Sequence, residues 1–293
     1  MLVGLAVIHR RGTLAPFLQI AWKLNGMFHR LCVSVFALLL SCSAHAEQWY
    51  AAPDGDDGND CLTLPCKTAQ AAVQKMPPGS HGLYLAPGVY DETINVSHGR
   101  QVSISGPIGA DGSCPDMNAL TVRQFWVQDN ATIWVSCLST AQVACRQWSI
   151  ADVLDVRFFG MERAALVAKE TCRINTGRTL VLDSAFVAFA RAENYSTIYL
   201  AGDIIVAREG LTSVAHFVGA IDSTVDLSNA KFSGHPLQAG KRFSLDHGVL
   251  VLPPGGIKPI PGAEPGEFVS FSICRGGGIH GGGDAACYER ASE

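Results

Sequence analysis

The sequence has few charged residues and lacks the basic excess that is typical of proteins binding nucleic acid. Charged residues make up 16% of its 293 residues, and the formal net charge is -4 at pH 7. The first 46 residues contain four basic residues and no acidic one, so their removal would leave a net charge near −8. We therefore expect no nucleic-acid partner.

The sequence also lacks the short motifs of several enzyme classes. It contains no G-x-S-x-G elbow, no P-loop, no dinucleotide-binding glycine fingerprint and no H-E-x-x-H pattern. It has no C-x-x-C pair, so the closely spaced ligands of a typical zinc site are missing. We therefore expect neither a cofactor nor a zinc ion.

No apolar run is long enough for a stable membrane span. The run LCVSVFALLL (31–40) has ten residues, about half of the ~20 that a spanning helix requires. It follows the basic start MFHR at Met27 and precedes the small residues SCSAHA. This order predicts a cleaved signal peptide over residues 1–46, with Met27 as the biological start and a secreted or periplasmic product. A twin-arginine signal before Met27, a lipoprotein site at Cys42 and a permanent anchor are the alternatives.

Eight cysteines remain after such a cleavage. An even number of cysteines in an exported chain predicts disulfides, although eight cysteines permit 105 pairings. We expect one bridge between Cys61 and Cys66 and another between Cys274 and Cys287, because each pair encloses a turn-rich local loop. The remaining pairings stay open.

Helical periodicity is scarce, and most of the chain reads as short strands. The clearest helical pattern lies over residues 68–76, where Thr68 is placed to act as the N-cap. Elsewhere, segments such as TIWVS (132–136) and TVDLSNAKF (224–232) are rich in β-branched and aromatic residues and are separated by Gly, Asn, Asp and Ser. The pattern predicts an all-β protein with one short helix.

Comparable strands recur about every two dozen residues. Their expected starts are Thr132, Val153, Thr179, Thr197 and Thr224. A loose period of this length predicts a solenoid, in which each coil buries its apolar side chains against its neighbours and the ends require covers. The helix then covers the N-terminal end. In the irregular, disulfide-closed C-terminal segment 253–293, the proline- and glycine-rich residues 253–267 leave the stack. A final strand is expected over residues 268–274, followed by a glycine-rich loop that the bridge between Cys274 and Cys287 closes.

The acidic stretch PDGDDGND (53–60) has two interpretations. As turn chemistry, its aspartates and glycines lead the chain from a first strand to the helix. As a calcium loop, Asp54, Asp56, Asp57 and Asp60 would supply oxygen ligands, although their spacing does not match the EF-hand pattern.

The segments WYAAPDGDDGND, PCKTAQAAV and LYLAPGVYDETINV, followed by VSISG, resemble the N-terminal pattern of the pectin-lyase-like superfamily. The matching positions are Pro65, Lys67, Thr68, Ala72, Pro87, Gly88, Tyr90 and Glu92. The resemblance covers about 60 residues and implies a single-stranded right-handed parallel β-helix over residues 47–293 with a short N-terminal capping α-helix. GVYDE (88–92) and DVRFFG (155–160) are also similar to segments of pectin methylesterases, but the L-G-R-P-W motif that carries their arginine is absent.

The resemblance implies a polysaccharide or a cell-surface glycan as the partner, while fold alone does not select an activity. The superfamily includes polysaccharide lyases, glycoside hydrolases, carbohydrate esterases and non-enzymatic adhesins. The sequence therefore predicts binding or processing of a polysaccharide on an outer groove. The alternative is a non-enzymatic surface, adhesin-like or structural module.

Two groups of residues are candidates for the site. Alternation in VLDVRFF (153–159) places Asp155 and Arg157 on one face, and stacking of the next coil in register would bring Asp183 close to Asp155. Two carboxylates and an arginine suit acid, base or nucleophile roles in sugar chemistry, whereas a surface ion pair is the alternative. Trp126 and Trp134 are candidate platforms for sugar rings, with core or loop packing as the alternative.

Overall fold

The computed structural model describes residues 47–160, 164–184, 186–208, 212–235, 238–239, 243–252, 271–275 and 278–280. The predicted signal peptide and Cys287 lie outside the described residues, so the structure says nothing of either. Within the described part of the chain, no helix is both long and apolar enough to cross a membrane. All described elements belong to one compact unit.

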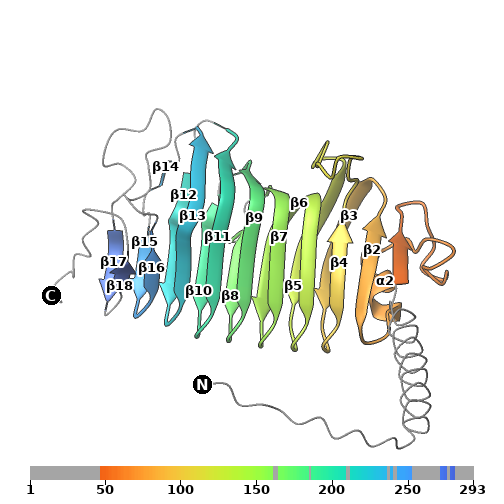
Figure 1. Ribbon diagram of the computed structural model, residues 1–293, viewed down its shortest axis with the longest axis horizontal. Coiled ribbons are helices and arrows are strands. Elements are labelled where there is room, and N and C mark those ends of the chain that lie inside the picture. The colour runs from red at the N-terminus through yellow and green to blue at the C-terminus, as the bar shows by residue number, and fades with distance from the viewer. Residues whose placement is uncertain are drawn as a thin grey trace, which may run out of the picture. The chain divides into compact units, whose positions relative to one another are not determined.

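The described elements are one helix, α2 (Ala69–Lys75), and a series of strands. The strands are β1 (Glu47–Ala51), β2 (Ser80–Leu85), β3 (Gly88–Val96), β4 (Gln101–Ser105), β5 (Leu120–Val127), β6 (Thr132–Arg146), β7 (Ile150–Phe158), β8 (Leu166–Lys169), β9 (Arg173–Leu182), β10 (Phe186–Glu193), β11 (Thr197–Val206), β12 (Thr212–Ile221), β13 (Thr224–Gly234), β14 (Gln238–Ala239), β15 (Phe243–Asp246), β16 (Val249–Val251), β17 (Phe271–Arg275) and β18 (Gly278–His280). The strands lie side by side along one axis (Figure 1). Residues 278–280, which the sequence placed in a loop, extend this stack by pairing with β16.

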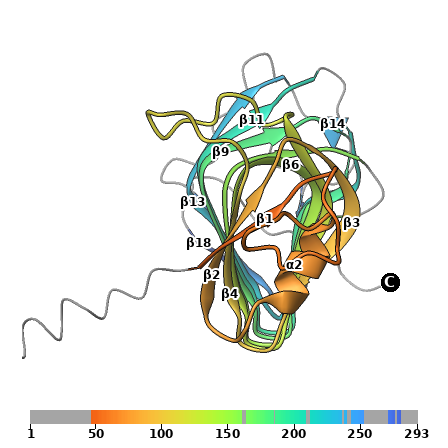
Figure 2. The ribbon, with the colours of Figure 1, turned by 90° about the vertical axis from the view of Figure 1, so that its right-hand side faces the viewer.

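Every ladder between the described strands is parallel, and the coils stack into three sheets (Figure 2). Face A consists of β1, β2, β4, β16, β18 and the N-terminal parts of β6, β7, β9, β11 and β13. Face B contains the starts of β3 and β5, the middle of β6 and the C-terminal parts of β7, β9, β11 and β13. Face C contains β8, β10, β12, β15, β17 and the ends of β3, β5 and β6. This arrangement confirms the predicted parallel β-helix.

Stacked apolar side chains fill the space between the three faces. On face A, one inward row passes from coil to coil without a polar interruption, and none of its members is exposed. The row consists of Val102, Ile133, Ala151, Ile174, Ile198, Val225 and Leu250. A single coil could not bury these side chains alone, so the stacking supplies the hydrophobic driving force.

The coils differ in length, which explains an error in the predicted recurrence. From Gln101, the equivalent positions are Thr132, Ile150, Arg173, Thr197 and Thr224, so successive coils take 31, 18, 23, 24 and 27 residues. The predicted starts Val153 and Thr179 are not equivalent to the others. Val153 stacks on Val135, and Thr179 pairs with Asp203 in β11. Turns of unequal length shifted the apparent period.

Left-handed residues turn the chain at two corners of each coil. At the corner between faces A and B, the positive-φ residues are Cys137, Asp155, Arg178 and Gly202. At the corner between faces C and A, non-glycine residues have φ between 47 and 64°, and they include Asp129, Asn130, Gln147, Trp148, Glu170, Thr171, Asn194, Tyr195, Asp222 and His247. These positions bend the strand within one or two residues, because the left-handed conformation reverses the local direction of the chain.

Helix α2 covers the N-terminal end of the stack, as the sequence predicted (Figure 2). The hydroxyl of Thr68 accepts a hydrogen bond from Ala71 N at 3.1 Å, which confirms its role as the N-cap. The carboxylate of Glu92 in β3 accepts further bonds from the first free N–H groups, Ala69 N at 2.7 Å and Gln70 N at 3.1 Å. The pKa of Glu92 is raised, because burial penalises its charged form more than these bonds stabilise it.

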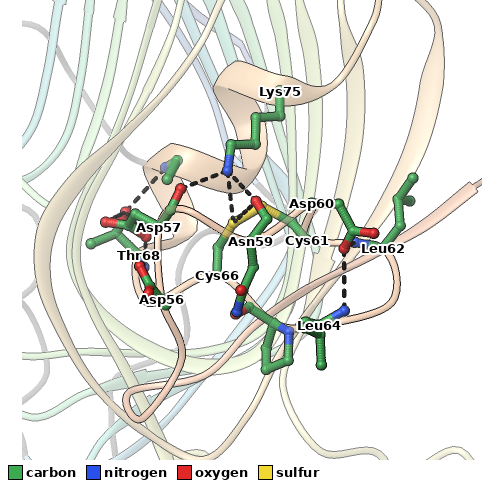
Figure 3. The surroundings of a disulfide bond; sticks show 12 residues. Asp56, Asp57, Asn59, Asp60, Cys61, Leu62, Leu64, Cys66, Thr68 and Lys75 are labelled. Atoms are coloured by element: carbon green, nitrogen blue, oxygen red, sulfur yellow. Dashed lines mark hydrogen bonds between the residues drawn. A yellow bond between two sulfur atoms is a disulfide. The ribbon is translucent and has the colours of Figure 1, made fainter.

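The predicted disulfide between Cys61 and Cys66 is present beside this helix (Figure 3). Lys75 closes the loop around it, since its ammonium group donates to the carbonyl oxygens of Asp57, at 2.6 Å, and of Asn59. Two further bridges, which the sequence left open, join Cys114 to Cys137 and Cys145 to Cys172. Cys287, the predicted partner of Cys274, lies outside the described residues.

Candidate functional site

Asp155 lies at a corner of the coil and not within a continuous strand. Its φ is +51°, and the register between β7 and β9 shifts between Leu154 and Val156. Val153 is therefore buried while Leu154 is only half-buried, so the predicted alternation through this segment is wrong. The corner interrupts the alternation of inward and outward side chains, so the pattern before Asp155 does not continue after it.

The carboxylate of Asp155 is held by the next coil. It accepts a hydrogen bond from Thr179 N at 3.1 Å and forms an ion pair with Arg178 Nη1 at 3.2 Å. Its side chain is mostly buried, whereas that of Arg178 is largely exposed. Asp155 thus stabilises the A/B corner through contacts with the adjacent coil.

Arg157 forms an ion pair with Asp183. Its Nε donates to Asp183 Oδ2 at 3.0 Å, and its Nη2 contacts the same oxygen. Arg208 approaches the other carboxylate oxygen at 2.5 Å, so one buried carboxylate joins three successive coils. The arrangement realises the ion-pair alternative, although the partner of Arg157 is Asp183 and not Asp155.

The strand register separates the two predicted carboxylates. Asp155 bonds Thr179 N in the next coil, and Asp183 follows Thr179 by four residues, a displacement of roughly 13 Å at the rise of a β-strand. Carboxylate pairs in glycoside hydrolysis lie about 5 to 9.5 Å apart. The prediction that Asp155 and Asp183 lie close together is therefore wrong, and they are not arranged as a catalytic pair.

Trp126 lies on face C, and one face of its ring is occupied. The guanidinium carbon of Arg146 lies 4.6 Å from the ring centroid, and Gln128 Oε1 accepts from Arg146 Nε at 3.2 Å. This cation–π contact leaves less of the indole for a sugar ring. Trp126 is thus a candidate platform with one side of its ring already in contact with an arginine.

Face C also carries an ion cluster around Glu193 at the end of β10. Its carboxylate accepts from Lys169 Nζ at 2.8 Å and pairs with Arg191 Nε. Burial acts to raise the pKa of Glu193, but the hydrogen bond and charge of Lys169 and the charge of Arg191 outweigh it and lower the pKa. This cluster links the coils and stays ionised at neutral pH.

Trp134 lies on face A within a row of outward side chains, which we call the face A row. Each member occupies the same register position on successive strands, and none is buried. The row consists of Gly82, Ser103, Trp134, Asp152, Asn175, Tyr199 and Asp226. It places aromatic rings three coils apart, with an acid and an amide between them.

Hydrogen bonds organise the middle of this row. Asn175 Nδ2 donates to Asp152 Oδ1 at 2.6 Å, and Arg173 Nε donates to Asn175 Oδ1 at 2.7 Å. The guanidinium of Arg173 also lies 4.6 Å from the ring centroid of Tyr199. These contacts fix polar groups that are able to bond sugar hydroxyls, because each side chain retains donor or acceptor capacity.

Sequence reasoning identified Trp134 but missed Asp152, Asn175 and Tyr199. Each lies in a different coil, and the distances between them in sequence are unequal because the coils differ in length. Only the strand register brings them into one row. The alternating pattern of TIYL at residues 197–200 was the available signal, since it places Tyr199 outward.

Aspartates of the acidic loop (53–60) accept hydrogen bonds from nearby groups of the protein. Asp60 Oδ1 accepts hydrogen bonds from Leu62 N, Thr63 N and Leu64 N at 2.9 to 3.2 Å, and the Thr63 hydroxyl donates to Oδ2. These bonds hold the pKa of Asp60 far below its usual range. Asp57 binds Thr68, so the loop behaves as the turn chemistry of the first interpretation.

One group of possible metal ligands occurs among the described residues at the A/B corner. The ligand atoms of Cys114, Cys137 and Asp155 all lie within 4.8 Å of one another. The two sulfur atoms are joined in a disulfide, so they carry no thiolate to bind a metal. The group therefore does not suit a metal ion in this state.

Comparisons with known proteins add a single solved structure. No protein-family model and no curated protein matches the chain. A pectin methylesterase from Aspergillus niger is similar in structure, at 12% sequence identity and a TM-score of 0.35, with 86% of this chain and 92% of that chain covered. The parallel pairing of the strands, and not this likeness, establishes the fold.

Proposed function

We propose that the protein is an exported β-helix protein that binds a polysaccharide along face A. The face A row is the observation that supports this most directly. Its side chains repeat at the spacing of the coils, about 4.8 Å, which is roughly the advance of one sugar residue in an extended chain. A glycan lying parallel to the axis would therefore meet an equivalent position at each sugar.

The chemistry of the row matches the chemistry of sugars. Trp134 and Tyr199 offer apolar ring faces to the C–H face of a pyranose; Tyr199 is 38% exposed, and Arg173 lies over one side of its ring. Asp152 and Asn175 lie between them and supply acceptors and donors for hydroxyl groups. A few fixed polar groups between aromatic platforms favour an oriented carbohydrate over an apolar ligand.

Export is part of the same proposal. Three disulfides join cysteines of the described residues. Structural disulfides form and persist in oxidising compartments, and they agree with the signal peptide expected at the N-terminus. The polysaccharide would then be an extracellular, periplasmic or cell-surface glycan.

A glycan-binding measurement tests the proposal. The full chain and its Trp134→Ala and Tyr199→Ala variants are run by affinity electrophoresis in gels containing pectin, alginate, cellulose derivatives or soluble chitin derivatives. We expect retardation of the wild type by at least one polymer and weaker retardation of both variants. Trp126→Ala serves as the matched tryptophan control, and we expect a smaller loss because Trp126 lies on face C and not in the face A row.

Unretarded migration of the wild type in every gel would refute the proposal. Equal losses of retardation in the Trp126→Ala and Trp134→Ala variants would contradict the assignment of the binding surface to face A. Thermal unfolding of each variant shows whether a lost affinity reflects a lost fold.

Whether the protein also cleaves or de-esterifies its glycan is a separate test. Arg157, Asp183 and Asp155 stay the candidates for catalysis, each acting separately and not as a carboxylate pair, with Asp183 as the more enclosed of the two carboxylates. Reducing ends, unsaturated products and released methanol are measured with any polymer that binds. Turnover that is lost in Asp183→Asn but kept in Trp126→Ala would support an enzyme; binding without turnover would support the adhesin-like alternative.

A further inference from the structure

Two aromatic side chains stand out from the surface at the corner between faces C and A. Trp148 is 72% exposed and Tyr195 is 79% exposed, the highest values among the large hydrophobic residues that the structure describes as exposed. We call this pair the aromatic ledge. It borders face A, because β7 and β11 begin two residues after its members.

The backbone conformation does not favour an aromatic residue at either position. Both residues have left-handed backbone conformations, with φ of +61° and +62°, which are unfavourable for bulky side chains. The same corner position in other coils holds small or polar residues, among them Asn130, Thr171 and Asp222. A strained backbone that exposes an aromatic ring points to a role outside folding.

The spacing of the ledge fits a chain with a repeat of two sugars. Trp148 N bonds Glu170 O, and Thr171 N bonds Asn194 O, so the two rings are separated by two coils. Two coil spacings amount to about 10 Å. In an extended β-1,4-linked chain of cellulose or chitin type, alternate rings present the same face after about this advance. The two rings could therefore stack on the first and third sugars of one chain.

The charge of the corner argues against an acidic glycan. Asp129, Glu170 and Asp222 are exposed at this corner, and they would repel a polyuronate. Basic side chains close to these residues in sequence have other partners: Arg146 lies over Trp126, Lys169 pairs with Glu193, and Arg173 lies over Tyr199. An uncharged chain avoids this repulsion, and its hydroxyl or amide groups can bond the acidic side chains.

We propose that the aromatic ledge binds an uncharged β-1,4-linked glycan by stacking alternate sugar rings on Trp148 and Tyr195. This inference rests on the proposed function of face A and narrows its substrate class. It adds two binding residues that lie outside the face A row. It also predicts a minimum ligand length of three sugars for full affinity.

Titration of the full chain with defined oligosaccharides tests the proposal. Cello-oligosaccharides and chito-oligosaccharides of two to six sugars are compared with hexa-galacturonate, and binding is followed by calorimetry and tryptophan fluorescence. We expect the affinity to rise between two and three sugars. Loss of one stacked ring should weaken binding of the hexasaccharide by about tenfold. Trp148→Ala and Tyr195→Ala should each abolish the rise with length, while Tyr50→Ala, an exposed tyrosine at the N-terminal end, should keep it.

The possible failures are distinguishable. One outcome would refute binding at the aromatic ledge and leave the proposed function standing. In that outcome the Trp148→Ala/Tyr195→Ala double variant keeps its affinity for the hexasaccharide, while Trp134→Ala loses affinity. Stronger binding of hexa-galacturonate than of the uncharged chains would overturn the inferred substrate class. Absence of binding to every oligosaccharide and every polymer would overturn both proposals.

Discussion

Replacing Trp148 by asparagine should stabilise the protein, although it removes a tryptophan. The left-handed conformation costs roughly 1–2 kcal/mol for an ordinary L-residue, and asparagine tolerates it far better. Because Trp148 is 72% exposed, the buried remainder of its side chain contributes only a fraction of the ~3 kcal/mol of a fully buried aromatic. The structure also shows that asparagine fits this corner, since Asn130 occupies the same position one coil earlier.

These contributions give a net gain of about 0.5–1 kcal/mol in the free energy of unfolding. For a domain of this size, the gain corresponds to a rise in Tm of about 1–4 °C. Thermal and urea unfolding of Trp148→Asn measure it. Trp134→Asn is the matched control, because Trp134 is half-buried in β6 and asparagine is disfavoured in strands.

A fall in Tm for Trp148→Asn as large as that for Trp134→Asn would refute the reasoning. It would mean that the exposed ring stabilises the fold by contacts that outweigh the backbone strain. A rise in Tm accompanied by loss of glycan affinity would instead show that the protein retains a strained residue for binding, at the expense of stability.

Three further predictions concern the scaffold. Gly202→Ala should destabilise the protein by more than about 1 kcal/mol, because φ is +85° and the added Cβ would lie 2.1 Å from Arg178 O; Gly99→Ala, with φ of +68° and no atom within 4 Å, should cost clearly less in the same urea titration. Glu193→Gln should lower Tm at neutral pH, and its deficit should shrink on acidification, because a carboxyl with a lowered pKa contributes stability above its unfolded-state pKa and loses it as the pH falls through the folded-state value. A deficit independent of pH would contradict this origin. Thr68→Ala should cost about 1 kcal/mol by removing the N-cap of α2, and an unchanged unfolding midpoint would show that Glu92 suffices to cap the helix.

The N-terminal cap was predictable because its signals are local. Thr68 precedes a helical pattern, and Cys61 and Cys66 enclose a short loop, so nearby residues alone specify the structure. The alternation of apolar residues likewise predicted strands and a stacked core. The Cys114–Cys137 and Cys145–Cys172 bridges were not predictable in the same way, because each joins positions that become neighbours only after the coils stack.

The candidate site shows where local patterns fail. The sequence grouped Asp155 with Arg157 by strand alternation, but the left-handed corner at Asp155 breaks that alternation and Asp183 pairs with Arg157 instead. A single residue with positive φ has little signature in sequence when it is an aspartate, since aspartate also occurs in ordinary strands and turns. The error therefore arose from a backbone conformation and not from the chemistry of the residues.

The amino-acid sequence alone determined that the protein is built from short β-strands with apolar interiors, has a capped helix over residues 68–76 and carries an acidic net charge. Those properties depend on composition, periodicity and contacts between residues close in sequence. Only the tertiary structure decided which side chains share a surface, because coils of unequal length place Trp134 beside Asp152 and Trp148 two coils from Tyr195. The register between coils follows from packing of the whole core, and no single segment encodes it.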